Sequence, residues 1–232
     1  MRLNKTLSRR RALIGNSGYA ANGLFAHYDG INNTGNGHSS AATKWYDLSP
    51  RKNDLSLLSS ASWEWVSRNI AYDTGSQNST WLHIPVSPDY TFEYLMQNFV
   101  VNESAAERIF YPICGSYSSN YNFSYAPEGI NLYVCGVQHT FDFPSDNMPH
   151  LFSAVVKPPY EVQLYCDGKL FETRATNIAV LEKLQVALGY SRGANAVTKD
   201  NMKFFACRIY DRALNDMEIL QNYNMDKERY AL

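Results

Sequence analysis

The sequence lacks several features that would assign it to a class directly. No apolar run approaches the ~20 residues that a membrane-spanning helix needs, so we expect no membrane insertion. The opening stretch MRLNKTLSRRRALIG has too short an apolar patch for an export signal. The net charge of −1 gives no overall attraction for nucleic acid. These absences favour a globular protein that is not exported and does not bind nucleic acid.

Cysteine is scarce, and its spacing does not indicate metal binding. The four cysteines lie in separate apolar, strand-like segments, at Cys114, Cys135, Cys166 and Cys207. None belongs to a CxxC motif or forms a Cys/His pair in the sequence, which is the usual pattern of a zinc site. We therefore predict buried free thiols and assign no metal ligand.

Catalytic motifs are also missing. A retaining glycoside hydrolase needs two carboxylates on one face of a strand, and neither Glu-x-Asp-x-Glu nor Glu-x-Asp-x-x-Glu occurs. The sequence has no Gly-x-Ser-x-Gly, His-Glu-x-x-His or Gly-x-x-x-x-Gly-Lys motif either. The five histidines are scattered along the chain. We therefore expect a protein that is not an enzyme.

Aromatic residues and short alternating runs are what the sequence does contain. Aromatics make up 14% of the 232 residues, and 17 of them are tyrosines. Such side chains suit half-buried strands. Strand-like runs recur between turn signals and no helices alternate with them, which predicts a sandwich and not a parallel sheet. These runs lie at 23–29, 62–66, 80–86, 90–101, 108–115, 129–136, 139–143, 150–157, 161–173, 184–191 and 202–214.

Two local patterns predict specific structures. Asp167 and Gly168 separate two alternating runs, which indicates a hairpin with a two-residue type I′ turn. Near the end of the chain, Asn215 and Glu218 have the spacing of a helix capping box. The apolar residues that follow at helical spacing predict a short helix packed on the sandwich through Met217, Ile219, Leu220 and Tyr223.

The stretch KFFACRIYDRALNDMEILQNY resembles the C-terminal signature of laminin-G-like, concanavalin A-like jelly-roll domains. The hairpin VQLYCDGKL, the strand VALGYS and the N-terminal segment from GLFAHYDG to LSLL are similar to other parts of that family. The resemblance implies an all-β, concanavalin A-like jelly-roll sandwich of two antiparallel sheets with a short C-terminal helix. We expect this domain over residues 20–232, after a basic arm over 1–19.

The same resemblance implies roles for a few residues. Tyr210 and Leu214 should pack in the core, and Arg212 should pair with a carboxylate near the helix start. Family members often carry an acidic pair where this chain has Ala206 and Cys207, which argues against a metal there. The signature therefore indicates a fold and not a site.

The opening Tyr-Asp-Gly-Ile-Asn-Asn beside the SRRRALIG arm is similar to structural proteins of bacteriophages and prophages. This implies a virion-associated protein present in many copies or as a homo-oligomer. Its arm would dock on other virion proteins through Arg9, Arg10 and Arg11. It would decorate the particle, bind bacterial surface or mucin glycans, or do both. The alternatives are a secreted or cell-surface bacterial lectin, a degenerate hydrolase, and a purely structural virion protein without sugar affinity.

The polar loop at 26–45 could hold calcium or serve only as a connection. An EF-hand starting at Asp29 fails, because the third, sixth and twelfth positions are Ile31, Thr34 and Ser40. A weak calcium site at a rim would have only Asp29 and Asp47 as nearby acids. Gly and Asn commonly serve turns, so a plain loop is favoured and no cofactor is assigned.

A second polar stretch, residues 114–129, is the candidate ligand-contact segment. Tyrosine rings can stack on sugar faces while asparagine amides bond to hydroxyls, a mixture also typical of adaptable binding loops. The candidate carbohydrate-binding residues are Tyr117, Asn120, Tyr121, Asn122 and Tyr125. Two other readings stay open. The segment could be a solvated hairpin connection, or its tyrosines could line a subunit contact.

Overall fold

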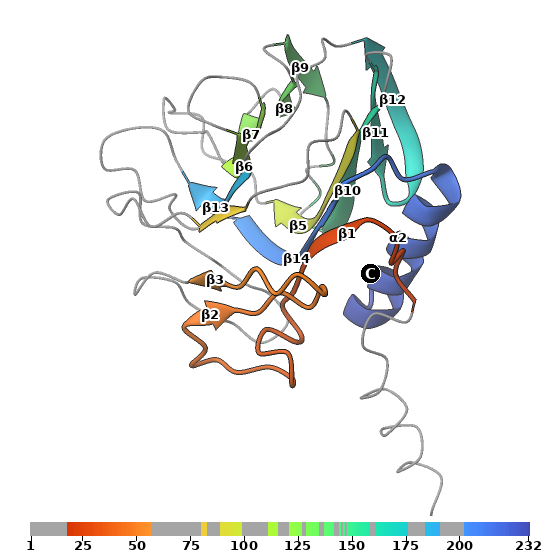
Figure 1. Cartoon of the computed structure of the whole chain (residues 1–232). Coiled ribbons are helices and arrows are strands. Elements are labelled where there is room, and N and C mark those ends of the chain that lie inside the picture. The colour runs from red at the N-terminus through yellow and green to blue at the C-terminus, as the bar shows by residue number, and fades with distance from the viewer. Residues whose placement is uncertain are drawn as a thin grey trace, which may run out of the picture.

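The computed structural model describes residues 18–56, 80–82, 89–98, 111–115, 121–126, 129–134, 137–141, 144, 146, 148–157, 161–175, 184–190 and 202–232. Over these ranges the chain forms two six-stranded antiparallel sheets, a small two-stranded sheet and a C-terminal helix (Figure 1). The prediction of an all-β sandwich with a short C-terminal helix is confirmed. The predicted strand at 62–66 and the arm residues Arg9, Arg10 and Arg11 lie outside the described residues.

The first sheet joins the two ends of the domain. Its strand order is β1-β14-β5-β10-β11-β12, and every neighbouring pair is antiparallel. The last strand therefore lies between the first strand and β5. The bounds are β1 Leu24–Asp29, β5 Tyr90–Asn98, β10 Pro149–Lys157, β11 Glu161–Cys166, β12 Lys169–Ala175 and β14 Met202–Tyr210.

The second sheet has the order β4-β13-β6-β7-β8-β9, also antiparallel throughout. Its strands are β4 Thr80–Leu82, β6 Tyr111–Gly115, β7 Tyr121–Ala126, β8 Gly129–Val134, β9 Val137–Phe141 and β13 Leu184–Tyr190. A separate pair, β2 (Lys44–Trp45) and β3 (Leu55–Ser56), closes the loop region that follows β1.

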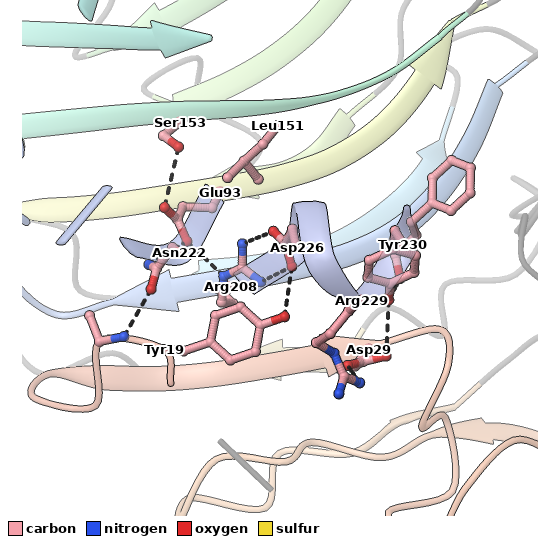
Figure 2. A network of polar contacts seen from close by, with 12 residues as sticks. Tyr19, Asp29, Glu93, Leu151, Ser153, Arg208, Asn222, Asp226, Arg229 and Tyr230 are labelled. Atoms are coloured by element: carbon pink, nitrogen blue, oxygen red, sulfur yellow. Dashed lines mark hydrogen bonds and ion pairs between the residues drawn. The ribbon is translucent and has the colours of Figure 1, made fainter. Parts of the chain in front are cut away.

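Both faces of the central strands of the first sheet are buried, whereas the edge strand β12 is largely exposed. Side chains alternate between the two faces of a strand, so each strand contributes to two layers. The layer toward the second sheet is apolar and includes Tyr28, Phe92, Tyr94, Phe152, Leu164 and Ile209. The opposite layer lies under helix α2 (Asp216–Tyr230) and contains charged side chains as well as apolar ones (Figures 1 and 2).

Helix α2 begins where the sequence predicts. The Asn215 side chain accepts hydrogen bonds from the backbone N–H groups of Met217 (3.0 Å) and Glu218 (3.1 Å). Glu218 Oε2 accepts from Asn215 N at 3.1 Å, which completes the capping box. The helix ends at Ala231, whose φ of 56° closes a left-handed C-cap.

The face that α2 buries differs from the predicted one. Met217 is 81% exposed and Leu220 is 44% exposed. The buried positions are Ile219, Asn222, Asp226 and Tyr230, which form one stripe at spacings of three and four. The predicted apolar packing face is thus wrong in part, because the sheet under the helix offers charged partners to Asn222 and Asp226.

The C-terminal signature packs as the resemblance implies. Tyr210 and Leu214 are buried. Arg212 donates from Nη1 and Nη2 to the two carboxylate oxygens of Glu218, at 2.8 and 2.6 Å. This bidentate pair ties the chain after β14 to the first turn of the helix.

The Asp-Gly turn is also confirmed. Asp167 and Gly168 have φ values of 51° and 76°, and Cys166 pairs with Lys169 across the hairpin. Only glycine accommodates the second position well, because a Cβ there would lie 3.1 Å from Tyr223 Cβ. The turn is therefore packed closely against α2. Within the described ranges, no helix is long and apolar enough to cross a membrane.

Candidate functional site

The polar loop after β1 is held by its own side chains. Asn33 Nδ2 donates to Ser39 O at 2.9 Å, and Ser39 N donates to Asn33 Oδ1 at 2.8 Å. Thr34 Oγ1 donates to Gly37 O at 2.8 Å, and Asn32 Oδ1 accepts from Gly37 N at 2.6 Å. These bonds replace the regular ladder that the loop lacks, so its asparagines serve the turn itself.

The two carboxylates considered for calcium already have donors. The Asp47 oxygens accept four hydrogen bonds of 2.7–2.8 Å, from His27 N, Ser49 N, Ser49 Oγ and Asn53 N. The Asp29 carboxylate accepts from Ile31 N and Asn32 N, lies 2.9 Å from the Tyr230 hydroxyl, and pairs with Arg229. Both side chains are buried. This arrangement favours the plain loop over a calcium site at the rim.

The candidate carbohydrate residues do not form one loop. Tyr121, Asn122 and Tyr125 belong to strand β7, which pairs with β8 from Tyr121↔Val134 to Tyr125↔Ile130. Tyr117 and Asn120 lie outside the described residues. Within the stretch 114–129, the structure describes the end of β6, the whole of β7 and the first residue of β8. The described part of this stretch is therefore strand, although its polar composition is typical of a loop.

A row of polar side chains crosses the first sheet on the face under α2. Arg208 of β14 pairs in register with His27 of β1 and with Glu93 of β5, and Glu93 pairs with Ser153 of β10. Side chains opposite one another in neighbouring strands point to the same side of a sheet. All four are buried, so the row lies inside the protein.

Arg208 is the centre of this row. Its Nε donates to Glu93 Oε2 at 2.7 Å, and its Nη1 donates to Asp226 Oδ1 at 2.9 Å, while Nη2 also bonds to Asp226 (Figure 2). The guanidinium carbon lies 4.5 Å from the centre of the Tyr19 ring, a cation–π contact. One cation therefore serves two carboxylates and an aromatic ring.

Helix α2 and the start of the domain complete the network. Asn222 Nδ2 lies 2.8 Å from Glu93 Oε2 and 2.9 Å from the Tyr210 hydroxyl, and its Oδ1 accepts from Ala20 N at 2.8 Å. The Tyr19 hydroxyl donates to Asp226 Oδ1 at 2.7 Å. Tyr19 is the last residue of the predicted arm, and its ring lies buried under the helix.

The electrostatics of the network are those of a closed structural core. Burial raises the pKa of Glu93, since one guanidinium must neutralise two carboxylates in a dry layer. Burial alone would lower the pKa of Arg208, but Asp226 and Glu93 raise it well above its ordinary value. No substrate reaches groups buried this completely, so these carboxylates stabilise the fold and do not act as acid or base.

This network was not predicted from the sequence, although one residue pointed to it. Glu93 stands in the longest apolar-rich run, where a charged residue is unexpected inside a central strand. Asn222 and Asp226 follow Ile219 at helical spacing, but the apolar pattern drew attention to the other side of the helix.

Three side chains of the kinds that can bind a metal also meet, which the sequence did not indicate. A ring nitrogen of His150, the Cys166 sulfur and a carboxylate oxygen of Asp167 all lie within 4.8 Å of one another. The sequence shows no Cys/His pair because the register of β10 on β11, and not a local motif, brings these residues together. Among the described cysteines, Cys166 is half-buried and Cys207 is buried, and both are free thiols.

The chain matches no family model and no curated protein. Solved structures do resemble it. The Trypanosoma rangeli sialidase in complex with sialic acid aligns with a TM-score of 0.63 at 12% identity, over 90% of this chain and 33% of the sialidase.

Two botulinum neurotoxin structures align as well. The serotype D binding domain gives a TM-score of 0.63 at 9% identity, over 88% of this chain and 52% of that one. A structure from work on the cell entry of neurotoxin type C gives 0.56 at 10% identity, over 88% and 51%. This chain thus spans between a third and about half of these proteins, and the likeness establishes a lectin-like β fold.

Proposed function

We propose that the chain is a non-catalytic glycan-binding module, carried on a bacteriophage or prophage particle. The observation that carries the glycan part is the match of the sandwich, over 88–90% of the chain, to three structures connected with binding. The sialidase is bound to sialic acid, and cell entry of neurotoxin type C depends on interaction with two ganglioside molecules. At identities of 9–12%, the sugar-binding residues of those proteins cannot be transferred to this chain position by position. The sugar contacts must be assigned from the residues of this chain.

The buried network supports binding over hydrolysis. A retaining glycosidase places two carboxyl groups about 5–5.5 Å apart on either side of a sugar bond that must reach them. Glu93 and Asp226, the two acids that share Arg208, are instead sealed between the first sheet and α2. These two acids are therefore committed to the fold.

The β6–β7 and β7–β8 hairpins are where we place the sugar contacts. The candidate residues Tyr121, Asn122 and Tyr125 belong to β7, which pairs with both β6 and β8, and Tyr117 and Asn120 stand between β6 and β7 in the sequence. Tyrosine offers a large rigid face at a low cost in conformational entropy, and asparagine offers both a donor and an acceptor.

An array of sialylated glycans, gangliosides and bacterial surface polysaccharides, probed with the full chain, tests this assignment. We expect a defined subset of glycans to bind. Replacement of Tyr117 or Tyr125 by Ala should weaken binding about tenfold, or ~1.4 kcal/mol. Tyr46→Ala is the matched control, because Tyr46 is an exposed tyrosine outside the hairpins. A silent array with folded protein would make the glycan assignment wrong.

The particle part of the proposal rests on the resemblance of the opening segment and on the basic arm. Arg9, Arg10 and Arg11 form a local run of positive charge on a nearly neutral chain, which suits an acidic docking surface on a neighbouring virion protein. Purified particles from the host strain should carry the protein. The triple replacement of these arginines by alanine should reduce its incorporation.

The two experiments together separate the competing functions. Incorporation without glycan binding would indicate a structural virion protein. Glycan binding by a protein that is absent from particles would indicate a secreted or cell-surface lectin.

A further inference from the structure

We infer that His150, Cys166 and Asp167 bind a zinc ion at the hairpin turn between β11 and β12. The three residues offer one nitrogen, one sulfur and one oxygen ligand, all within 4.8 Å of one another. Zinc is held in proteins by this mixture of Cys, His and carboxylate donors. The site lies in the first sheet, whereas the hairpins proposed to bind glycans belong to the second, and the inference does not depend on that function.

Backbone contacts hold two of the ligands, Cys166 and Asp167, in place without a metal ion. Phe152 of β10 pairs with Cys166 of β11, so Leu151 lies opposite the turn residue Asp167. Asp167 N donates to Leu151 O at 2.9 Å, and Leu151 N donates to Asp167 Oδ1 at 3.0 Å. With Oδ1 held in this way, Oδ2 is presented to His150, whose Nδ1 lies 2.7 Å away.

The outer contact of the histidine matches that of a metal ligand. His150 Nε2 lies 3.0 Å from Asp146 Oδ1. Histidines that bind zinc usually donate the other ring N–H to a carboxylate, which orients the ring and fixes its tautomer. His150 would thus bind zinc through Nδ1 while Nε2–H donates to Asp146. Asp146 is not one of the three ligands, so its contact with His150 supports the site independently of them.

The size of the cluster also fits. Zinc bonds of about 2.0–2.3 Å in a tetrahedron place neighbouring ligand atoms roughly 3.3–3.8 Å apart. The His150–Asp167 contact of 2.7 Å must therefore open by roughly 0.6–1 Å. The metal would take the place of the hydrogen between Nδ1 and Oδ2, and the Cys166 thiol would also lose its proton. Three protein ligands leave a fourth position for water or for a side chain of a partner.

Cobalt titration of the full chain, stripped with a chelator and kept reduced, tests the site. We expect one equivalent of Co²⁺ to give the intense visible bands of tetrahedral cobalt and a thiolate-to-cobalt band in the near ultraviolet, both removed by Zn²⁺. A spectrum of octahedral cobalt without the thiolate band would overturn the inference.

Variants assign the signal to residues. Cys166→Ser should abolish the thiolate band, whereas Cys207→Ser should keep it. Asp146→Asn should weaken the affinity about 10–100-fold, the usual cost of losing an outer carboxylate. Asp167→Asn removes a ligand charge but keeps the turn, because Asn-Gly also favours type I′. A thiolate band of full strength in Cys166→Ser would overturn the inference.

A measurement on the unmodified chain does not depend on whether the variants fold. Zn²⁺ should slow alkylation of Cys166 by iodoacetamide at least tenfold, as read by peptide mass spectrometry, and should leave the alkylation of unfolded protein unchanged. Equal alkylation rates with and without Zn²⁺ would also overturn the inference.

Discussion

Replacement of Asp226 by Asn should be among the most damaging single changes in this protein. The carboxylate accepts two hydrogen bonds from Arg208 and one from the Tyr19 hydroxyl, and all three side chains are buried. The substitution keeps the shape but removes the charge, and the amide nitrogen of Asn would face donors. Removing one partner of a buried ion pair typically costs about 3–5 kcal/mol. Glu93 would still balance the charge of Arg208, so the cost here comes from the loss of two charge-assisted hydrogen bonds and from an amide NH2 that faces the guanidinium.

Urea unfolding, followed by circular dichroism and tryptophan fluorescence, measures this loss. In thermal unfolding of a chain of this length, a loss of ~1 kcal/mol in the free energy of unfolding lowers the melting temperature by about 2–4 °C. The melting temperature of Asp226→Asn should therefore fall by roughly 6–20 °C. The matched control is Glu172→Gln, which breaks the exposed Arg174–Glu172 pair and should cost less than about 1 kcal/mol. A loss below ~1 kcal/mol for Asp226→Asn would refute the view that Arg208 depends on it.

Three further changes test the local structure. Asn215→Ala should cost about 1 kcal/mol in urea unfolding because it removes the helix cap, whereas Asn215→Asp should stay near wild type. Gly168→Ala should cost more than about 1 kcal/mol, since φ is positive and the new Cβ would press on Tyr223; unchanged stability would contradict this. Burial, with the charge of Arg208, lowers the pKa of His27 to about 3. As the pH is lowered, the unfolded chain therefore protonates His27 before the folded protein does. The free energy of unfolding should fall by up to ~1.4 kcal/mol per pH unit as the pH drops from about 6.5 to 3, and the profile should be flatter in His27→Gln.

The local elements could be predicted because their causes are local. The Asp167-Gly168 turn needs only two residues that tolerate positive φ, and the start of α2 needs only Asn215 and Glu218 at the right spacing. Alternation of apolar residues placed most of the described strands for the same reason, but not β2, β3 or β7. The C-terminal signature then indicated how these elements assemble.

The polar layer could not be predicted because its partners are far apart in sequence. Arg208 meets Glu93 across 115 positions, and Asn222 meets Ala20 across 202. In a single sequence, Asn222 and Asp226 are typical of the solvent side of a helix. Only the row of charges on the sheet beneath makes that side the buried one.

The positions of the candidate site residues in the fold could not be predicted for a related reason. His150 and Cys166 are 16 positions apart, and only the register of two strands shows that they meet. A polar, tyrosine-rich stretch such as 114–129 has the composition of a loop. Tyr121, Asn122 and Tyr125 are nevertheless strand residues, because tyrosine also suits a pleated sheet.

The position of β14 between β1 and β5 sets an order of events during synthesis. β1 ends at Asp29, and among the described strands its one partner is β14, which begins at Met202. At about 5–20 residues per second, the ribosome needs roughly 10–35 s to make the chain between them. Throughout that interval the apolar edge of β1 has no strand to pair with, and the charged row has no arginine. The strands β5, β10, β11 and β12 can pair before β14 is made, but the completion of the first sheet must wait for the last strand, and we expect β1 to be exposed to aggregation and to chaperones until β14 emerges.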